Sequence, residues 1–186
     1  NVAADIGRLF GEAIATKIDT DLLALFDGFS STLGNGSAAI TPNNFFQAVT
    51  ILRTAGVPMT DMVAVLHPNI AFDLKSALAT QGNTAFAAGG DGILANEALR
   101  TGFIGQLAGV PVFESKNMAN TGTTGDYKGA IFQKDALGIA MMQDLKIEVQ
   151  RDASLRADEI VATAVYGVGE LHDSYGIELH YDSSIE

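Results

Sequence analysis

The sequence predicts an α+β fold, with a long helix first, a mixed centre and strands at the end. From residue 3 to residue 26 apolar side chains recur at the spacing of one helix face. Residues 41–143 contain both helical and strand patterns, and residues 145–150 alternate between apolar and polar types. This order favours α+β over a doubly wound sheet.

The first helix is long for a chain of this size. At about 1.5 Å per residue it extends roughly 35 Å. Its charged residues Arg8, Glu12, Lys17 and Asp21 fall mostly on the side opposite the apolar stripe. The sequence begins at Asn1 rather than at a methionine, so we expect a part of a longer or processed chain.

Composition excludes several classes of protein. The 186 residues are 47% hydrophobic and 18% charged, which argues against disorder. The sequence has no cysteine, so disulfides and thiolate metal sites are excluded. A net charge of −11 disfavours a protein that grips nucleic acid with Lys and Arg. The apolar runs are shorter than the roughly 20 residues that span a bilayer, and we expect no membrane association.

The centre of the chain begins with a predicted loop over residues 29–40, which are small, polar and rich in glycine. A second helix then starts with Thr41 as its cap and Pro42 at its first position, and ends at Gly56. Residues 62–67 are predicted to be a buried strand, and Pro68 to open a third helix.

Glycine-rich loops and strands follow. We expect loops over 82–92 and 117–126, while 134–143 fits a helix or a strand equally well. Strands are predicted over 110–114, 128–132 and 145–150. Two more strands are predicted, a buried one over 160–168 and a half-exposed one over 177–181. Two pairs, Arg151 with Asp152 and Arg156 with Asp158, are predicted to form an ion-paired turn between two of these strands.

Histidines and carboxylates near the end of the chain could form a metal site, because both are good ligands. The candidates are His172, Asp173, Glu178, His180 and Asp182. Their spacing matches no metal motif, and the alternation predicts that the last three lie on a solvated face. A metal-dependent hydrolase is therefore only an alternative.

No other segment favours catalysis. The glycine-rich loop at 82–92 lacks the ending of a phosphate-binding loop, and no serine lies in a nucleophile elbow. His67, before Pro68, is predicted to be a strand-end or helix-entry residue. We predict a protein that is not an enzyme and needs no cofactor.

Three stretches together resemble the major capsid proteins of tailed double-stranded DNA phages, the Hong Kong 97-type fold. IGRLFGEAIATKID is similar to the end of the family's long spine helix. VAVLHPNIAFDLKSAL, followed by GQLAGVPVFESKNM, is similar to the axial domain. LKIEVQRDASLRADEIVATAVYGVGELHDSYGIELHY is similar to the returning strands of the peripheral domain.

The resemblance implies a domain organisation and a structural function. Residues 1–28 would be the spine helix of the peripheral domain, 29–143 the axial domain and 144–186 the returning strands. The protein would build pentamers and hexamers of an icosahedral shell around DNA. An encapsulin-like compartment shell, which shares the fold, is the near alternative. The family's N-terminal arm and extended loop, which precede the spine helix, are not in this sequence, and we predict no covalent cross-link from it.

The resemblance also implies contact residues and partners. Arg8, Glu12 and Lys17 would face solvent or a neighbouring subunit. The partners would be other copies of the chain, with minor capsid, portal or decoration proteins possible, and DNA would be enclosed without sequence-specific binding. The protein would lie in the virion capsid after assembly in the host cytoplasm. The loop at the capsomer axis would contribute Phe86, Gly89, Gly90, Asp91, Ile93 and Leu94.

Overall fold

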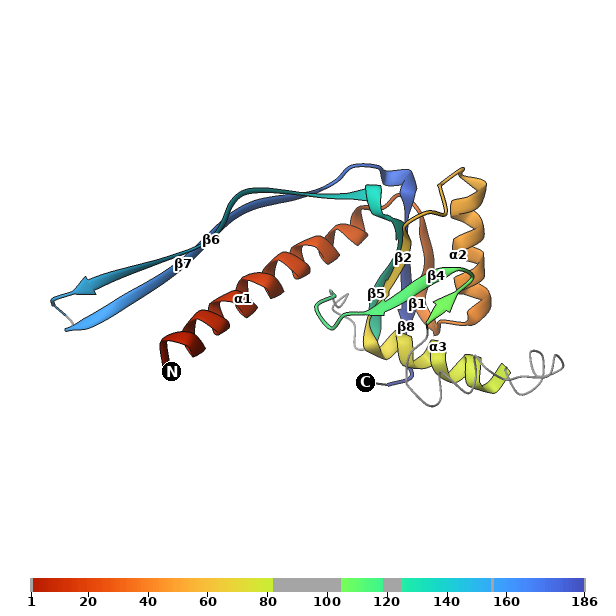
Figure 1. The fold of residues 1–186 in the computed structure, drawn as a ribbon. Coiled ribbons are helices and arrows are strands. Elements are labelled where there is room, and N and C mark those ends of the chain that lie inside the picture. The colour runs from red at the N-terminus through yellow and green to blue at the C-terminus, as the bar shows by residue number, and fades with distance from the viewer. Residues whose placement is uncertain (1, 82–104, 119–124, 155, 186) are drawn as a thin grey trace.

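A computed structural model describes residues 2–81, 105–118, 125–154 and 156–185. These residues form a body built on one sheet and an elongated arm that leaves it on one side (Figure 1). The arm consists of α1 (Val2–Ala24) and a hairpin made of β6 (Leu137–Asp152) and β7 (Ala157–Glu170). The division into body and arm separates the packed core from most of the exposed apolar surface.

The body contains a mixed six-stranded sheet in the order β1-β8-β5-β2-β4-β3. The β1–β8 and β2–β4 pairs are parallel, and the other three pairs are antiparallel. The strands are β1 (Thr32–Ala39), β2 (Met62–Leu66), β3 (Gln106–Leu107), β4 (Val110–Glu114), β5 (Asp126–Gln133) and β8 (Gly176–Asp182).

Two helices, α2 (Pro42–Thr54) and α3 (Pro68–Gln81), pack against one face of this sheet and form the main core. The predicted start of α2 is confirmed, because Asn44 N donates a hydrogen bond to the hydroxyl of Thr41 at 3.3 Å. The core buries apolar side chains of both helices and five strands, among them Phe45, Leu52, Leu66, Ile70, Leu74, Leu107, Val110, Ile131, Ile177 and Leu179.

The end of α1 packs against the other face of the sheet. There the chain continues into the 3-10 turn η1 (Leu25–Gly28), and Leu23, Phe26 and Phe29 are buried in a second, smaller core. The ring of Phe26 lies 5.1 Å from that of Phe132 on β5 and 6.0 Å from that of Phe29. The long helix is therefore anchored to the body by its C-terminal end.

The predicted loop over 29–40 is wrong over most of its length. Residues 32–39 form β1, which pairs in parallel with β8. The two glycines Gly34 and Gly36 have φ of 92° and 68°, and the register with β8 shifts after Gly34. The small, polar composition indicates a loop locally, but pairing with the neighbouring strand supplies the backbone hydrogen bonds that make it an edge strand.

Two further expectations about burial are corrected. The strand over 177–181 was expected to be half-exposed, but β8 lies inside the sheet between β1 and β5, and Glu178 is 5% exposed. The strand over 160–168 was expected to be buried, but β7 lies in the arm, where Val161 is 41% and Val165 45% exposed. Both errors arise because composition alone does not reveal how many layers cover a strand.

The segment 134–143, which fits helix or strand by sequence, contains a short 3-10 turn η4 (Lys134–Ala136) and the beginning of β6. Another 3-10 turn, η5 (Asp173–Tyr175), connects β7 to β8. An ion pair does lie at the predicted turn, but with another pairing than expected: Arg151 faces Asp158 across the hairpin, with Nη1 and Oδ1 3.0 Å apart.

The elements cross the domain boundaries expected from the resemblance. Position 143/144 lies inside β6, and β8 pairs with β5 along its whole length. Residues 176–182 therefore share a sheet with strands of the middle segment. Among the residues that the structure describes, no helix has the length and apolar character needed to cross a membrane.

Candidate assembly surface

The long helix is held along its second half by two carboxylates that point to different partners. Asp19 accepts hydrogen bonds from Ser115 Oγ at 3.1 Å and from Asn117 Nδ2 at 2.7 Å, both in the segment after β4. Asp21 accepts a hydrogen bond from the Tyr166 hydroxyl of β7 at 2.7 Å. These bonds connect α1 to the body on one side and to the hairpin on the other.

Lys17 completes this arrangement. Its ammonium lies 2.6 Å from Asp21 Oδ1, one helical turn away. The hydrogen bonds from Lys17 and Tyr166 hold the pKa of Asp21 below its ordinary value, and the bond to Asp21 raises the pKa of Lys17. From the sequence, Lys17 was expected to face solvent or a neighbouring subunit. The structure gives it a partner within its own chain.

Arg8 and Glu12 lie farther out on the helix and pair with each other. Arg8 Nη1 and Glu12 Oε1 are 2.8 Å apart, and the two side chains are 66% and 58% exposed. Such an exposed pair contributes little to folding. These two residues therefore face away from the body, and the structure leaves their side chains accessible to solvent or to a neighbouring chain.

The hairpin presents an apolar face toward α1, which we call its inner face. Tyr166 lies on this face, and the register places Met141 opposite Tyr166 and Ile147 opposite Ala162. Although α1 and the hairpin leave the body on the same side, they separate away from it (Figure 1). As a result much of this apolar face is open, including Ile139 (46%), Met141 (46%), Leu145 (41%), Ile147 (46%) and Val149 (67%).

Part of the apolar stripe of α1 is exposed to solvent in the same way. Leu9 of its apolar stripe is 56% exposed, whereas Leu23 near its C-terminal end is 8% exposed. The stripe is therefore covered most completely near the body. Together the inner face and the outer half of α1 form an exposed apolar region, and we refer to them as the arm surface.

The six residues expected at a capsomer axis cannot be placed. Phe86, Gly89, Gly90, Asp91, Ile93 and Leu94 all lie outside the described residues.

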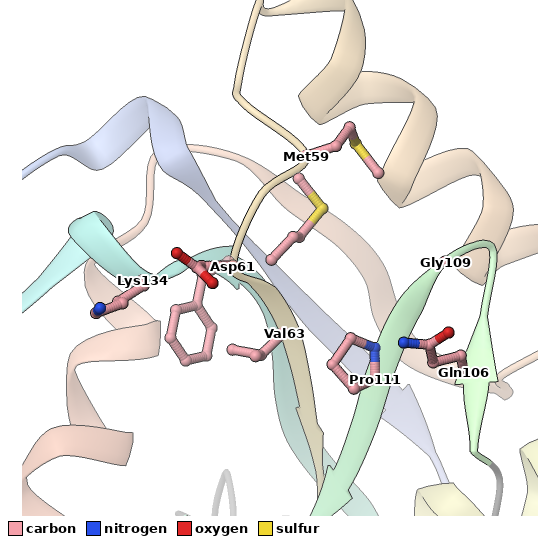
Figure 2. A pocket seen from close by; sticks show the side chains of 9 residues that line it. Met59, Asp61, Val63, Gln106, Gly109, Pro111 and Lys134 are labelled. Carbon is pink, nitrogen blue, oxygen red and sulfur yellow. The ribbon is translucent and has the colours of Figure 1, made fainter.

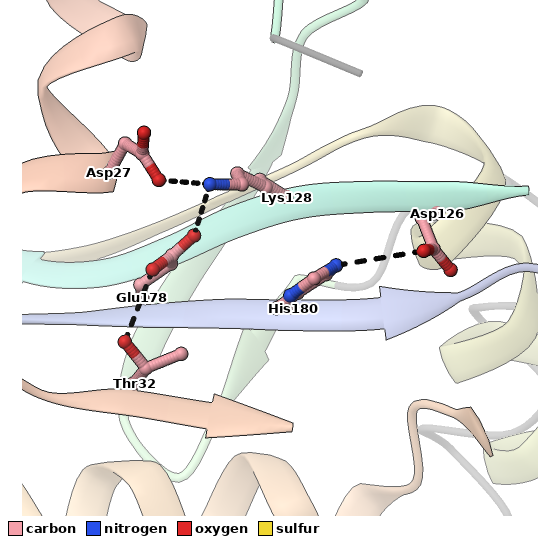
Figure 3. A network of polar contacts seen from close by, with 6 residues as sticks. All are labelled: Asp27, Thr32, Asp126, Lys128, Glu178 and His180. Atoms are coloured by element: carbon pink, nitrogen blue, oxygen red, sulfur yellow. Dashed lines mark hydrogen bonds and ion pairs between the residues drawn. The ribbon is translucent and has the colours of Figure 1, made fainter. Parts of the chain in front are cut away.

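A polar network lies on the face of the sheet beneath η1, where sequence reasoning expected solvent (Figure 3). Lys128 of β5 contacts Asp27 of η1 and lies 2.9 Å from Glu178 Oε1. Thr32 of β1 donates a hydrogen bond to Glu178 Oε2 at 3.1 Å. Burial lowers the pKa of Lys128, but the hydrogen bonds with Asp27 and Glu178 outweigh it and raise the pKa overall.

The same face contains His180, whose Nε2 lies 3.9 Å from Asp126 Oδ2 (Figure 3). The other candidate ligands do not join it. His172 precedes η5 and packs against the ring of Tyr175 at 5.0 Å, and Asp173 accepts hydrogen bonds from the backbone and hydroxyl of Ser30. Within the described ranges, no three histidine, cysteine or acidic side chains form a group that could hold a metal ion.

His67 behaves as the sequence predicts. It precedes α3, and its Nδ1 accepts a hydrogen bond from Asn69 N at 3.3 Å. Its ring stacks on Tyr127 with centroids 3.9 Å apart, and burial lowers its pKa. This histidine therefore has a structural role at the start of the helix.

A groove of about 490 Å³ lies beside β2 and β4 (Figure 2). Met59, Val63, Pro111 and Phe132 provide apolar lining, and Asp61 and Lys134 provide charges of both signs. The nine lining residues include no histidine, serine or cysteine, so this groove does not combine a nucleophile with a histidine base.

Comparison with known proteins identifies the family. A family model described as phage capsid protein matches residues 1–177. A solved chain of Mycobacterium phage Che8 is 26% identical with a TM-score of 0.77, over 94% of this chain and 61% of that one. No curated protein matches the sequence.

Two more distant structures share the fold. A chain from the acidic stable capsid of Helicobacter pylori bacteriophage KHP30 has 12% identity and a TM-score of 0.71, covering 98% of this chain and 69% of that one. A chain of the holo-SrpI encapsulin complex from Synechococcus elongatus PCC 7942 has 13% identity and a TM-score of 0.65, covering 95% and 65%.

This chain spans about three fifths of the Che8 chain, 61% of its length. The α+β fold predicted from the sequence is confirmed by these structures, and the Hong Kong 97-type resemblance agrees with them. A long helix, an extended hairpin and a body with a mixed sheet are thus combined in a chain whose sequence matches one family model over nearly its whole length. The chain belongs to the phage capsid protein family.

Proposed function

We propose that this chain is a major capsid protein that assembles with copies of itself into the pentamers and hexamers of an icosahedral shell around double-stranded DNA. The supporting observation is the arm surface, where five apolar side chains of β6 are each more than 40% exposed. Exposed apolar surface of this extent on a protein marks an interaction site.

The shape of the arm supports the same proposal. An isolated two-stranded hairpin is at best marginally stable in water, because it buries too little apolar surface. Here β6 and β7 extend well beyond the body, and the hydrogen bond between Tyr166 and Asp21 joins the hairpin to α1 near the body. Packing against neighbouring subunits would supply the missing burial, at about 25 cal/mol for each Å² of apolar area.

We propose the same peripheral and axial domains that the resemblance implies, with their boundaries moved to the ends of helices and strands. The peripheral domain consists of residues 1–28 together with β6 and β7, and the axial domain consists of the sheet with α2 and α3. Strand β8 belongs with the axial domain because it pairs with β5. The segment containing Phe86, Gly89, Gly90, Asp91, Ile93 and Leu94 is proposed to meet its copies at the capsomer axis.

The role we infer is structural, without turnover and without a cofactor. A net charge of −11 fits a shell that encloses DNA without binding it tightly. Minor capsid, portal or decoration proteins are further proposed partners. The proposed location is the virion capsid, after assembly in the host cytoplasm.

The test is electron microscopy of the purified full-length protein with analysis of what the particles enclose. Closed shells with nuclease-resistant double-stranded DNA from infected cells support the proposal. Shells that enclose an enzyme instead indicate an encapsulin-like compartment, the alternative that the SrpI structure keeps open. A protein that stays monomeric under all assembly conditions contradicts both.

A further inference from the structure

We propose that Asn35 is a site of spontaneous chemical modification, at which the side-chain amide is lost as ammonia and a carboxylate takes its place. The reaction uses the backbone nitrogen of Gly36 as nucleophile and consumes one molecule of water. The inference goes beyond the proposed shell function and does not rest on it.

The first argument is the residue that follows Asn35. Gly36 has no Cβ, so its backbone nitrogen can approach Cγ of the preceding side chain without steric hindrance. The nucleophile and the carbonyl carbon belong to neighbouring residues, and closing a five-membered ring between them has a low entropic cost. Asn35 is the only asparagine of the sequence that precedes a glycine. The sequence therefore favours this asparagine over the others.

The second argument is a hydrogen bond that positions the carboxamide. The backbone N–H of Ser37 donates to Oδ1 of Asn35 at 3.3 Å. This bond folds the side chain back along its own backbone, as in an Asx turn, and keeps Cγ near the nitrogen of Gly36. When the ring closes, negative charge develops on Oδ1, and a backbone N–H that already points at this atom stabilises it. The structure thus provides a donor for the transition state beside the nucleophile.

The third argument is the position of Asn35 in the sheet. Strand β1 lies at one edge of the body sheet, and the side chain of Asn35 is exposed to water. The pairing of β1 with β8 reaches Gly34 and resumes at Ala39, so Asn35 and Gly36 lie where the register is interrupted. An interrupted edge restrains the backbone less than a continuous ladder does, and ring closure needs such freedom.

Two other asparagines lack these features. Nδ2 of Asn69 donates a hydrogen bond to the carbonyl of Ile185 at 3.2 Å, and Nδ2 of Asn117 donates one to Asp19 at 2.7 Å. These bonds must break before either nitrogen can leave. Asn69 also lies in α3, where the helical backbone is fixed. Both residues are therefore internal controls for Asn35.

The reaction has two steps. In the first, the nitrogen of Gly36 bonds to Cγ of Asn35, the bond from Cγ to Nδ2 breaks, and Nδ2 leaves as ammonia with the proton that the Gly36 nitrogen has lost. A cyclic imide remains. In the second, water adds to one of the two imide carbonyls and breaks its bond to nitrogen. Addition at Cγ gives aspartate, and addition at the main-chain carbonyl gives isoaspartate, whose backbone runs through Cβ and Cγ.

Both products change the edge of the sheet. Each adds a negative charge to a chain whose net charge is already −11. The carboxylate of Asp126 packs against Gly36, where an added Cβ would lie 2.8 Å from it, so the new charge arises next to a residue that already contacts one. Isoaspartate also lengthens the main chain by one carbon atom, which shifts the residues that follow relative to β8. The change accumulates with the age of the protein.

Peptide mapping by mass spectrometry tests the proposal on the purified, unmodified chain. The protein is incubated at mildly alkaline pH, and samples taken over time, including a sample at time zero, are scored for conversion of amide to acid. We expect residue 35 to convert on the order of tenfold faster than Asn69 and Asn117, because only its nucleophile and donor are in place. Conversion should be faster at higher pH, since the attacking nitrogen must lose its proton. Two products should separate, and an isoaspartate-specific methyltransferase should label one of them.

Asn35→Gln is the matched variant, because the longer side chain would have to close a six-membered ring, and we expect it to abolish the conversion. Asp27 also precedes a glycine, but its carboxylate is paired with Lys128, and we expect no isoaspartate there. An amide that persists at residue 35, or conversion at Asn69 and Asn117 at the same rate, would overturn the inference. Neither result depends on whether the protein forms shells.

A further variant tests the role of the hydrogen bond. Ser37→Pro removes the N–H that donates to Asn35. In the folded protein this variant should convert on the order of tenfold more slowly than the unmodified chain, whereas in urea the two should convert at similar rates. Equal rates in the folded state would contradict the proposed stabilisation of Oδ1.

Discussion

The hydroxyl of Tyr166 donates a hydrogen bond to Asp21 across 145 positions of the sequence, at 2.7 Å. This bond joins the helix of the arm to its hairpin at the place where both leave the body. Two residues earlier on the same helix, Asp19 binds the segment after β4. Two carboxylates two positions apart on one helix therefore connect α1 to the body and to the hairpin.

Replacement of Tyr166 by Phe should loosen this junction. The ring remains, but Asp21 loses one of the two hydrogen bonds that lower its pKa. A carboxylate with a lowered pKa stabilises the fold above its ordinary pKa and loses that effect as the pH falls. We therefore expect the NMR titration of Asp21 in Tyr166→Phe to move upward toward 3.8, its ordinary value. The exchange of residues 160–168 should also become faster. Glu12→Gln, in the exposed pair with Arg8, should change neither, and an unchanged Asp21 titration would show that the bond is not formed in solution.

Substitution of Gly176 by Ala should destabilise the subunit, because an added Cβ would overlap the buried ring of Phe29. Overpacking of this kind costs about 1–3 kcal/mol of unfolding free energy. Gly167→Ala is the matched control, since a Cβ there meets nothing within 4 Å. Urea unfolding of both variants measures the difference. Equal stability of the two variants would show that the chain relaxes around Phe29 without strain.

Shortening a side chain to alanine should affect stability differently in the outer half of α1 and in the turn η1 that follows the helix. Phe26 is 1% exposed, and Phe26→Ala should lower the free energy of unfolding by about 3–5 kcal/mol. Leu9 is 56% exposed, so Leu9→Ala should leave the stability of the isolated subunit almost unchanged but weaken shell assembly. Thermal unfolding and electron microscopy distinguish these effects. Normal assembly of Leu9→Ala at all protein concentrations would exclude the outer half of α1 from the interface.

Lys128 should contribute to stability through Glu178, which is buried. Lys128→Met leaves that carboxylate without its cation and should cost about 1–3 kcal/mol. Because the folded pKa of Lys128 lies above its ordinary value of 10.5, the contribution is complete at neutral pH and is lost as the pH rises beyond 10.5. Lys146→Met breaks an ion pair whose side chains are 60% and 58% exposed and should have little effect. Denaturant unfolding at pH 7 compares the two variants, and similar losses would contradict the network.

Phe86→Asp tests the proposed axis loop. A charge repeated around a five- or six-fold axis adds like-charge repulsion at close range. We expect a subunit with normal circular dichroism that does not form capsomers in size-exclusion chromatography. Shell formation as in the unmodified protein would refute the axial position of Phe86, and loss of secondary structure would indicate that this side chain packs inside its own domain.

Much of the local structure could be predicted because its signals are local. Thr41 and Pro42 specify the start of α2, Pro68 that of α3, and the alternation from Leu145 to Gln150 a strand. The edge strand β1 could not be predicted in this way, since its glycines and small polar residues are stabilised by β8, more than a hundred positions away. For the same reason the bond between Asp21 and Tyr166 has no signal in the sequence, and the roles of Arg8, Glu12 and Lys17 at an interface stay predictions.

The sequence by itself determined the helices, most of the strands and the family, because periodicity, caps and residue order act over short distances. Only the tertiary structure decided which faces are covered. Strand β8 alternates like a half-exposed strand, yet Glu178 is buried because Lys128 and Thr32 satisfy it from neighbouring strands. Strand β7 reads as a buried strand, yet it is exposed because the body ends before it. Burial depends on what packs above a strand, and that is a property of the whole fold.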